Sequence, residues 1–131
     1  DFAVISAHGR AGYEDADEIA LPNRVILRPG LIARLRPQLV YLDSCNLGVS
    51  LTYIRAMQAA GVKYVVAPIL SNEAGESSTL TMQAFFREIV AGRDPVASLH
   101  VARTRAYNAY GRRDIVTQLW RAFPFRIYAL N

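Results

Sequence analysis

Predicted strands and helices alternate along the chain, and this alternation limits the possible folds more than any other feature of the sequence. Apolar runs rich in branched residues predict strands, and periodic apolar residues between them predict helices. The strands are expected at residues 2–7, 39–42, 62–68 and 125–130, and the helices at about 31–36, 51–60, 77–91 and 95–107. Such alternation favours an α/β fold with a mainly parallel sheet and helices on both faces, a three-layer α/β/α sandwich.

The first two strands are expected to lie inside this sheet. Residues 2–7 and 39–42 are continuous apolar runs, the pattern of a strand buried on both faces. Functional sites in open parallel sheets form beyond the carboxyl ends of the strands. The residues that follow these two strands are therefore the first candidates for catalytic or binding roles.

Short polar residues, glycine and proline mark the ends of the predicted elements. Ser50 is placed to cap the helix that Gly61 ends, and Asp94 is placed to cap the helix that starts at Pro95. Residues 19–28 predict a short hairpin with its turn at a Pro-Asn pair. Glycine-rich or polar segments predict loops at residues 8–12, 13–18 and 108–113.

Composition excludes several classes of protein. A chain of 131 residues with 52% hydrophobic residues makes one domain or part of one, and it is not a disordered tail. The only cysteine is Cys45, so no disulfide can form within the chain. No apolar run approaches the roughly 20 residues of a membrane helix, and we expect a cytoplasmic protein without membrane contact. His8, His100 and Cys45 are too few for a zinc site, nucleotide-binding glycine motifs are lacking, and no cofactor is expected.

His8 and Cys45 each follow a predicted strand directly. Cys45 sits in a polar strand-to-helix turn, and a nearby helix N-terminus would favour its thiolate form. His8 is followed by Gly9, whose lack of a side chain lets the backbone N–H approach a substrate oxygen. If the two strands are neighbours, His8 and Cys45 form a base and a nucleophile at one edge of the sheet. The backbone N–H groups of Gly9 and Cys45 would then form an oxyanion hole.

This pattern resembles the caspase-like cysteine peptidases. A strand followed by His8-Gly9, and a second strand followed by Asp43-Ser44-Cys45-x-x-Gly48, occur in the order found in that superfamily. The Asp-Ser-Cys sequence is similar to metacaspases, whereas the downstream segments resemble the bacterial CHAT group more closely. Those segments are residues 60–67, 81–86, 91–92, 95–99 and 120–123. The resemblance covers nearly the whole chain from residue 6 onward.

The resemblance implies a cysteine endopeptidase that uses a Cys–His dyad and no cofactor. His8 would be the general base or ion-pair partner, and Cys45 would attack the scissile carbonyl. In metacaspase-like relatives an Asp two residues before the cysteine lines a pocket for a basic P1 residue, and Asp43 has that position. Glu73 follows the third strand, where relatives build the other wall of the pocket. The simpler interpretations are that Asp43 caps a helix or stabilises a turn and that Glu73 is an exposed acid in a loop. If the two acids line a substrate pocket, we expect cleavage after Arg or Lys.

Two further expectations follow from comparison with the caspase-like pattern. Caspase-like domains have two strands and their helices before the histidine strand, so residues 1–131 are predicted to be a single domain that lacks its first strands. Bacterial CHAT domains are often joined to repeats or sensors, which implies regulation by a partner domain or protein. The alternative function is a latent or inactive caspase-like domain that acts as a protein-interaction module.

Residues 101–131 contain six arginines but only one acidic residue, Asp114, and Tyr107 and Tyr110 lie among the arginines. The arginines are Arg103, Arg105, Arg112, Arg113, Arg121 and Arg126. Such a basic strip could contact phosphates. The simpler interpretation, which we prefer, is a solvated helix face in an Arg-rich protein, so nucleic acid is not an expected partner.

Overall fold

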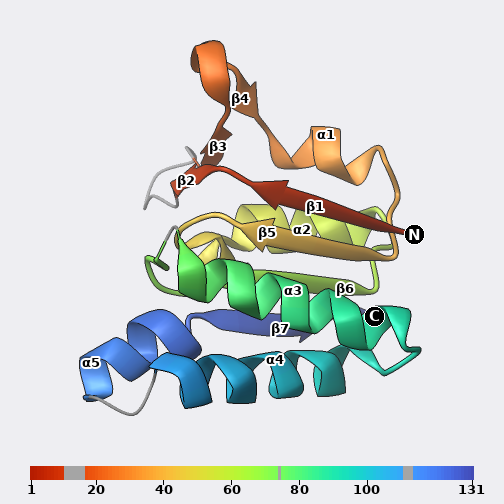
Figure 1. Cartoon of the computed structure of the whole chain (residues 1–131). Helices are drawn as coiled ribbons and strands as arrows, with labels where there is room; N and C mark the ends of the chain where they lie inside the picture. The colour runs from red at the N-terminus through yellow and green to blue at the C-terminus, as the bar shows by residue number, and fades with distance from the viewer. Residues whose placement is uncertain (11–16, 74, 111–113) are drawn as a thin grey trace. The chain divides into compact units, whose positions relative to one another are not determined.

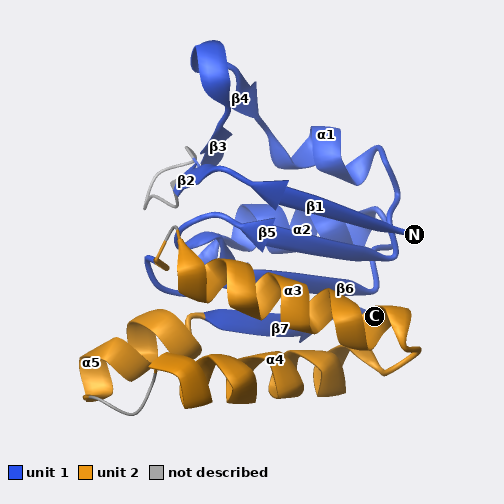
Figure 2. Cartoon of the chain, viewed as in Figure 1, with its two compact units in different colours: residues 1–71, 125–131 blue, residues 72–124 orange. Residues whose placement is uncertain are grey.

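The computed structural model describes residues 1–10, 17–73, 75–110 and 114–131 (Figure 1). These residues form two units, coloured separately in Figure 2. The first unit comprises Asp1–Ser71 and Phe125–Asn131, and the second comprises Asn72–Pro124. The predicted acidic loop at 13–16 and the predicted loop end at 111–113 lie outside the described residues.

A four-stranded sheet forms the centre of the first unit. Its strands are β1 (Phe2–Ser6), β5 (Leu39–Asp43), β6 (Tyr64–Pro68) and β7 (Phe125–Ala129), in the order β1-β5-β6-β7. The first three are parallel to their neighbours, and β7 runs antiparallel to β6. The predicted mixed α/β fold with a mainly parallel sheet is confirmed. The caspase-like topology and the single domain stay predictions.

Helices α1 (Pro29–Ala33) and α2 (Leu51–Ala59) pack against one face of this sheet. Val40 of β5 and Val65 of β6 point to that face, and they pack in one cluster with Ile32, Tyr53 and Met57 from the helices. The apolar residues at helical spacing in α2 thus face the sheet, as their period predicts. On the opposite face of the sheet the rings of Tyr41 and Phe125 are in contact, with centroids 5.4 Å apart.

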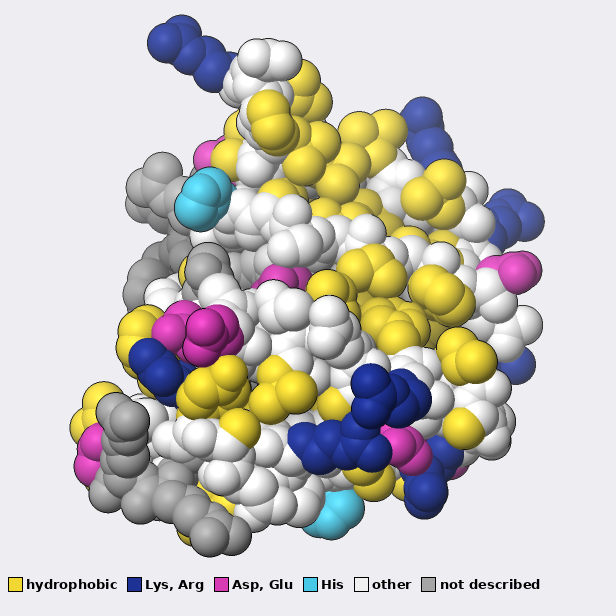
Figure 3. Space-filling view, viewed as in Figure 1, with side chains coloured by type: hydrophobic (Ala, Val, Ile, Leu, Met, Phe, Trp, Pro, Cys, Tyr) yellow, Lys and Arg dark blue, Asp and Glu magenta, His cyan; other side chains and the backbone are white. Residues whose placement is uncertain are grey.

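Strand β1 is not buried on both faces, and that prediction was wrong. It is an edge strand of the sheet and pairs only with β5. Its residues alternate between half-buried and exposed, and the side chains of Phe2 and Val4 are 55% and 41% exposed. Hydrophobic side chains gather over β1 in the space-filling view (Figure 3). A strand at a sheet edge has a neighbour on one side only, so its apolar sequence does not ensure burial.

The segment after β1 forms a second, antiparallel sheet. It consists of β2 (His8–Arg10), β3 (Glu18–Ala20) and β4 (Ile26–Leu27), with the short 3₁₀ helix η1 (Pro22–Arg24) between the last two. The predicted hairpin is confirmed, but residues 8–10 are a strand rather than a loop. They pair with β3, where Ile19 is fully buried and supplies the apolar contact that a polar, glycine-containing segment lacks.

Ser50 caps α2 as predicted, and this contact supports a stability prediction. Its hydroxyl accepts a hydrogen bond from the Tyr53 N–H at 3.1 Å and donates one to Asp17. Replacing Ser50 with alanine should lower the free energy of unfolding by about 1 kcal/mol, because a helix N–H loses its acceptor. Urea unfolding checks this. The control is Thr52→Ala, an exposed position of the same helix, and equal losses in the two variants would contradict a capping role.

Buried tyrosines in the first unit predict a loss of stability in alkali. Burial raises the pKa of Tyr53 from its ordinary value of 10.0 to about 12, and it also raises the pKa of Tyr41 and Tyr128. Between pH 10 and about 12 the folded chain keeps phenolic protons that the unfolded chain has released, so stability falls as pH rises through this window. Below it the contribution is fully present. Urea unfolding from pH 8 to 11.5 should show this fall.

A Tyr53→Phe variant provides the check on this assignment. It should be less stable at neutral pH, because it removes the hydrogen bond from the Tyr53 hydroxyl to the Leu27 carbonyl at 2.6 Å. Its stability should also fall less steeply between pH 10 and 11.5. An unchanged slope would assign the alkaline loss to other groups.

The second unit is helical. It contains α3 (Glu76–Val90), α4 (Pro95–Tyr110), α5 (Ile115–Thr117) and the π-helical turn η3 (Gln118–Ala122). The first two helices match the prediction, although α4 continues to residue 110, where a loop was expected. The helical residues 115–122 were not predicted. No helix among the described residues is long and apolar enough to cross a membrane.

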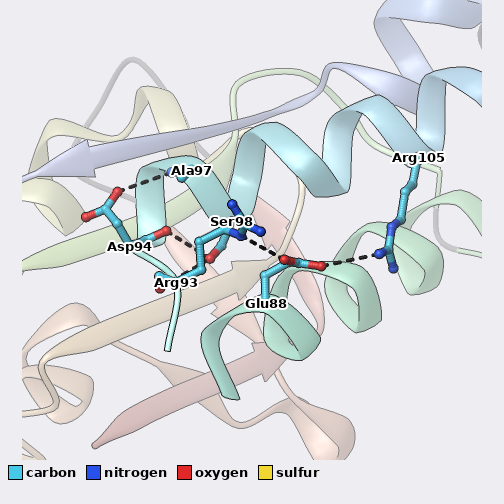
Figure 4. A network of polar contacts seen from close by, with 6 residues as sticks. All are labelled: Glu88, Arg93, Asp94, Ala97, Ser98 and Arg105. Atoms are coloured by element: carbon cyan, nitrogen blue, oxygen red, sulfur yellow. Dashed lines mark hydrogen bonds and ion pairs between the residues drawn. The ribbon is translucent and has the colours of Figure 1, made fainter. Parts of the chain in front are cut away.

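The turn between α3 and α4 is held by a polar network (Figure 4). Glu88 of α3 accepts hydrogen bonds from Arg93 at 2.8 Å and from Arg105 at 3.2 Å. The Asp94 carboxylate accepts from two N–H groups of the first turn of α4, including that of Ala97 at 3.2 Å. The predicted cap at Asp94 is therefore confirmed.

Candidate functional site

The strands that precede His8 and Cys45 are direct neighbours in the sheet. In the parallel pair β1–β5, Ser6 lies opposite Asp43, and the N–H of Ala7 donates to the Asp43 carbonyl at 3.2 Å. The segments that follow β1 and β5 therefore leave the sheet at the same edge, where the carboxyl ends of these strands lie. The adjacency on which the dyad prediction depends is present.

Gly9 packs directly on the backbone of the cysteine loop. A Cβ at Gly9 would lie 2.8 Å from the carbonyl oxygen of Cys45 and 2.8 Å from the carbonyl carbon of Ser44. The glycine is needed here for space, because any side chain would collide with this peptide. The contact joins the His8-Gly9 segment to the Ser44-Cys45 segment.

The two proposed catalytic side chains are both accessible. His8 is exposed, and Cys45 is a half-buried free thiol. In contrast, the neighbouring Ser44 is 1% exposed. Within the described part of the chain, no hydrogen bond of the His8 imidazole or the Cys45 thiol is found, so neither group is occupied by a described partner. Burial argues against Ser44 as a nucleophile, and the role of Cys45 stays a prediction.

The first helical residues after Cys45 form the three-residue 3₁₀ helix η2 (Leu47–Val49), and α2 begins at Leu51. The expected effect of a helix N-terminus on the Cys45 thiolate stays a prediction.

Gly48 fixes the other end of the cysteine loop. A Cβ at Gly48 would lie 2.8 Å from the Pro68 carbonyl oxygen and 2.9 Å from that of Ala67, at the end of β6. The hydroxyl of Tyr128 on β7 donates a hydrogen bond to the Gly48 carbonyl. The three-residue spacing between Cys45 and Gly48 thus lets the loop turn tightly against the next strand of the sheet. Sequence reasoning missed Tyr128, because no local pattern links it to a loop 80 residues away.

Asp43 lies at the end of β5, at the same strand edge. Its carboxylate accepts a hydrogen bond from the Ser6 hydroxyl at 2.9 Å, and the side chain is half-buried. Its negative charge also contributes to the raised pKa of Tyr41, after burial. Asp43 is therefore a carboxylate two residues from the candidate nucleophile with one side reachable from solvent.

Glu73 belongs to the second unit, and its carboxylate already has partners there. One oxygen accepts from the Ser77 hydroxyl at 2.6 Å, and the other pairs with Arg121 at 3.0 Å. An acid held in this way would have to give up a partner to bind a substrate cation. Its role in a pocket wall stays a prediction.

Three arginines of the basic strip near the C-terminus have partners within the second unit. Arg105 pairs with Glu88, Arg121 pairs with Glu73, and Arg103 stacks on the ring of Phe123 at 5.0 Å. Arg126 lies on β7 in the first unit, and residues 112–113 lie outside the described residues. Ion pairs occupy two of the arginines that a phosphate backbone would need.

Comparison with known proteins identifies no family for this chain. No protein-family model matches the sequence, and no curated protein matches it significantly. The likeness to the caspase-like CHAT group therefore rests on the order and spacing of the residues in this chain. Among the described residues, no group of three or more His, Cys, Asp or Glu side chains could hold a metal ion.

Proposed function

We propose that this chain is a caspase-like cysteine peptidase in which Cys45 and His8 form the catalytic dyad. The observation that carries the proposal is the backbone contact between Gly9 and Cys45 at the carboxyl edge of two neighbouring parallel strands. This contact places an accessible histidine and an accessible thiol on adjoining segments. The same edge is where parallel sheets form their active sites.

In the proposed reaction, His8 takes the thiol proton and the Cys45 sulfur attacks the scissile carbonyl carbon. The N–H groups of Gly9 and Cys45 donate to the oxyanion as the C–S bond forms. His8 then gives its proton to the leaving amine, and the C–N bond breaks to leave an acyl-enzyme. Water, deprotonated by His8, releases the acid and restores the thiol. The chemistry needs no cofactor.

Asp43 is the proposed specificity residue for a basic P1 side chain. Its half-buried carboxylate is two residues from Cys45, and its hydrogen bond to Ser6 orients it. An Arg or Lys side chain would form a charge-assisted pair with it. Glu73 would contribute to the same preference only if it gave up its ion pair with Arg121 and paired with the P1 side chain of the substrate instead. Regulation by a partner and a cytoplasmic location belong to the same proposal.

The alternative is a caspase-like module that binds proteins without cleaving them. The exposed apolar face of β1, with Phe2 and Val4, is the observation that favours it. A binding module would keep this surface but would not need a reactive thiol at Cys45. The reactivity of that thiol therefore separates the two functions.

Alkylation of Cys45 tests the proposal directly. A chloromethyl ketone with Arg at P1 should label Cys45 at least tenfold faster than the same reagent with Asp at P1. His8→Ala should slow the labelling at least tenfold, because the thiol loses its base. His100→Ala is the matched control, since His100 is an exposed histidine in the second unit, and it should change nothing. If Cys45 were labelled only as fast as a small-molecule thiol, and His8→Ala did not change that rate, the binding-module function would be favoured.

A further inference from the structure

The segment that contains α1 and α2 is rich in positive charge. Residues 19–71 contain a single carboxylate, Asp43, and six cationic side chains. These are Arg24, Arg28, Arg34, Arg36, Arg55 and Lys63. The three ion pairs found between described residues join side chains of the second unit, and none of them involves these six cations. Arg34 caps the end of α1 and Arg55 lies in α2, and cations without an acidic neighbour attract an acidic partner.

A shallow groove of about 410 Å³ lies between α1 and α2 on this surface. It is lined by Gly30 and Ala33 from α1, by three alanines near the end of α2, and by Arg34 and Arg36. A Cβ at Gly30 would meet nothing within 4 Å, which shows how open the α1 side is. Small side chains in the lining let a backbone approach closely, and the two arginines place positive charge beside it.

Large apolar side chains are exposed next to the groove residues. Leu31 and Leu35, which alternate with the lining of α1, are 48% and 71% exposed. On α2, Leu51 is 63% exposed and lies one helical turn before Arg55 on the same side of the helix. Leucine and arginine are therefore presented together, a combination that complements an apolar face bordered by acids.

We propose that the groove between α1 and α2 docks an acidic amphipathic helix of a partner protein. The partner's apolar face would cover the small lining residues and the leucines, and its Asp and Glu side chains would pair with Arg34, Arg36 and Arg55. Nucleic acid fits less well, because phosphates gain nothing from exposed leucines. A flat membrane surface fits less well, because it cannot enter the groove between the two helices. The proposal does not depend on peptidase activity, since no groove residue belongs to the Cys45 site.

Binding of a designed peptide tests this surface. The probe is a fluorescein-labelled helical peptide of about 18 residues, with leucine and alanine on one face and glutamate on the other. Fluorescence anisotropy should show binding that is at least tenfold tighter than that of the same peptide with lysine in place of glutamate. Raising the salt from about 50 to about 500 mM should weaken it, because exposed charge pairs are screened.

Variants of the full chain locate the binding site. Arg34→Gln with Arg36→Gln should weaken binding at least tenfold, and Ala59→Phe should weaken it by filling the groove without changing charge. The matched control, Lys63→Gln with Arg87→Gln, removes two exposed cations that do not line the groove and should have less than a threefold effect. Equal losses in the two double variants would overturn the proposal. Tighter binding of double-stranded DNA or of phosphatidylserine vesicles than of the acidic peptide would overturn it as well.

Discussion

Replacing Cys45 with alanine is expected to reduce hydrolysis of an Arg-P1 peptide by about 10⁴-fold or more. The nucleophile and its base act as a unit, so His8→Ala should have an effect of similar size, and the double variant should lose little more. The physical reason is that the neighbouring Ser44 is only 1% exposed and cannot take over from the thiol. The measurement is the steady-state rate with fluorogenic peptides that differ only at P1.

Ser44→Ala is the matched control for this experiment. The Ser44 hydroxyl is buried and makes no hydrogen bond within the described part of the chain, so removing it should leave turnover and stability nearly unchanged. If Ser44→Ala abolished turnover while Cys45→Ala did not, the nucleophile would be misassigned. Equal turnover of Arg, Asp and Leu at P1 would remove Asp43 from specificity while leaving the dyad intact.

Gly48→Ala is expected to lower the free energy of unfolding by about 1–3 kcal/mol. The added Cβ would lie 2.8 Å from the Pro68 carbonyl oxygen and 2.9 Å from that of Ala67, both backbone atoms of β6. Strand β6 is paired on both sides, so it cannot move to relieve the collision. The cysteine loop has to shift instead, and the Tyr128 hydrogen bond to Gly48 should weaken. Urea unfolding measures the loss, and alkylation of Cys45 reports the displacement of the loop.

Gly30→Ala is the matched control for Gly48→Ala. Gly30 lies in α1 at a position where an added Cβ would meet nothing within 4 Å. Alanine there should keep or raise stability by about 0.5–1 kcal/mol, because glycine loses more conformational freedom on folding. Equal destabilisation by the two substitutions would show that crowding at Gly48 is not the cause.

Asp43 and Glu73 show why specificity residues are harder to predict than nucleophiles. The resemblance to caspase-like peptidases implies that both are pocket acids. The structure gives Glu73 two partners in its own unit, Ser77 and Arg121, and gives the half-buried Asp43 a hydrogen bond from Ser6. Which carboxylate is available to a substrate depends on side chains distant in sequence. Only the folded chain brings those side chains together.

The sequence alone was sufficient for the features that depend on neighbours along the chain. The cap at Ser50, the turn glycine at Gly61 with φ of 79°, and the cap at Asp94 all occur where local chemistry predicts them. The central strand β5 is buried on both faces, as its apolar run predicts. These features follow from hydrogen bonds and backbone preferences that act over a few residues, so a local pattern contains the necessary information.

Tertiary structure decided which strand lies at the edge and what surrounds the cysteine loop. The apolar sequences of β1 and β5 predict the same burial, yet β1 is half exposed because it has one neighbour and β5 has two. Likewise, Gly9 and Gly48 are needed because the backbone of Ser44 and Cys45 packs on the first and that of Ala67 and Pro68 on the second. Burial and close packing are properties of spatial neighbours, and the chain acquires those neighbours only when its distant segments pair.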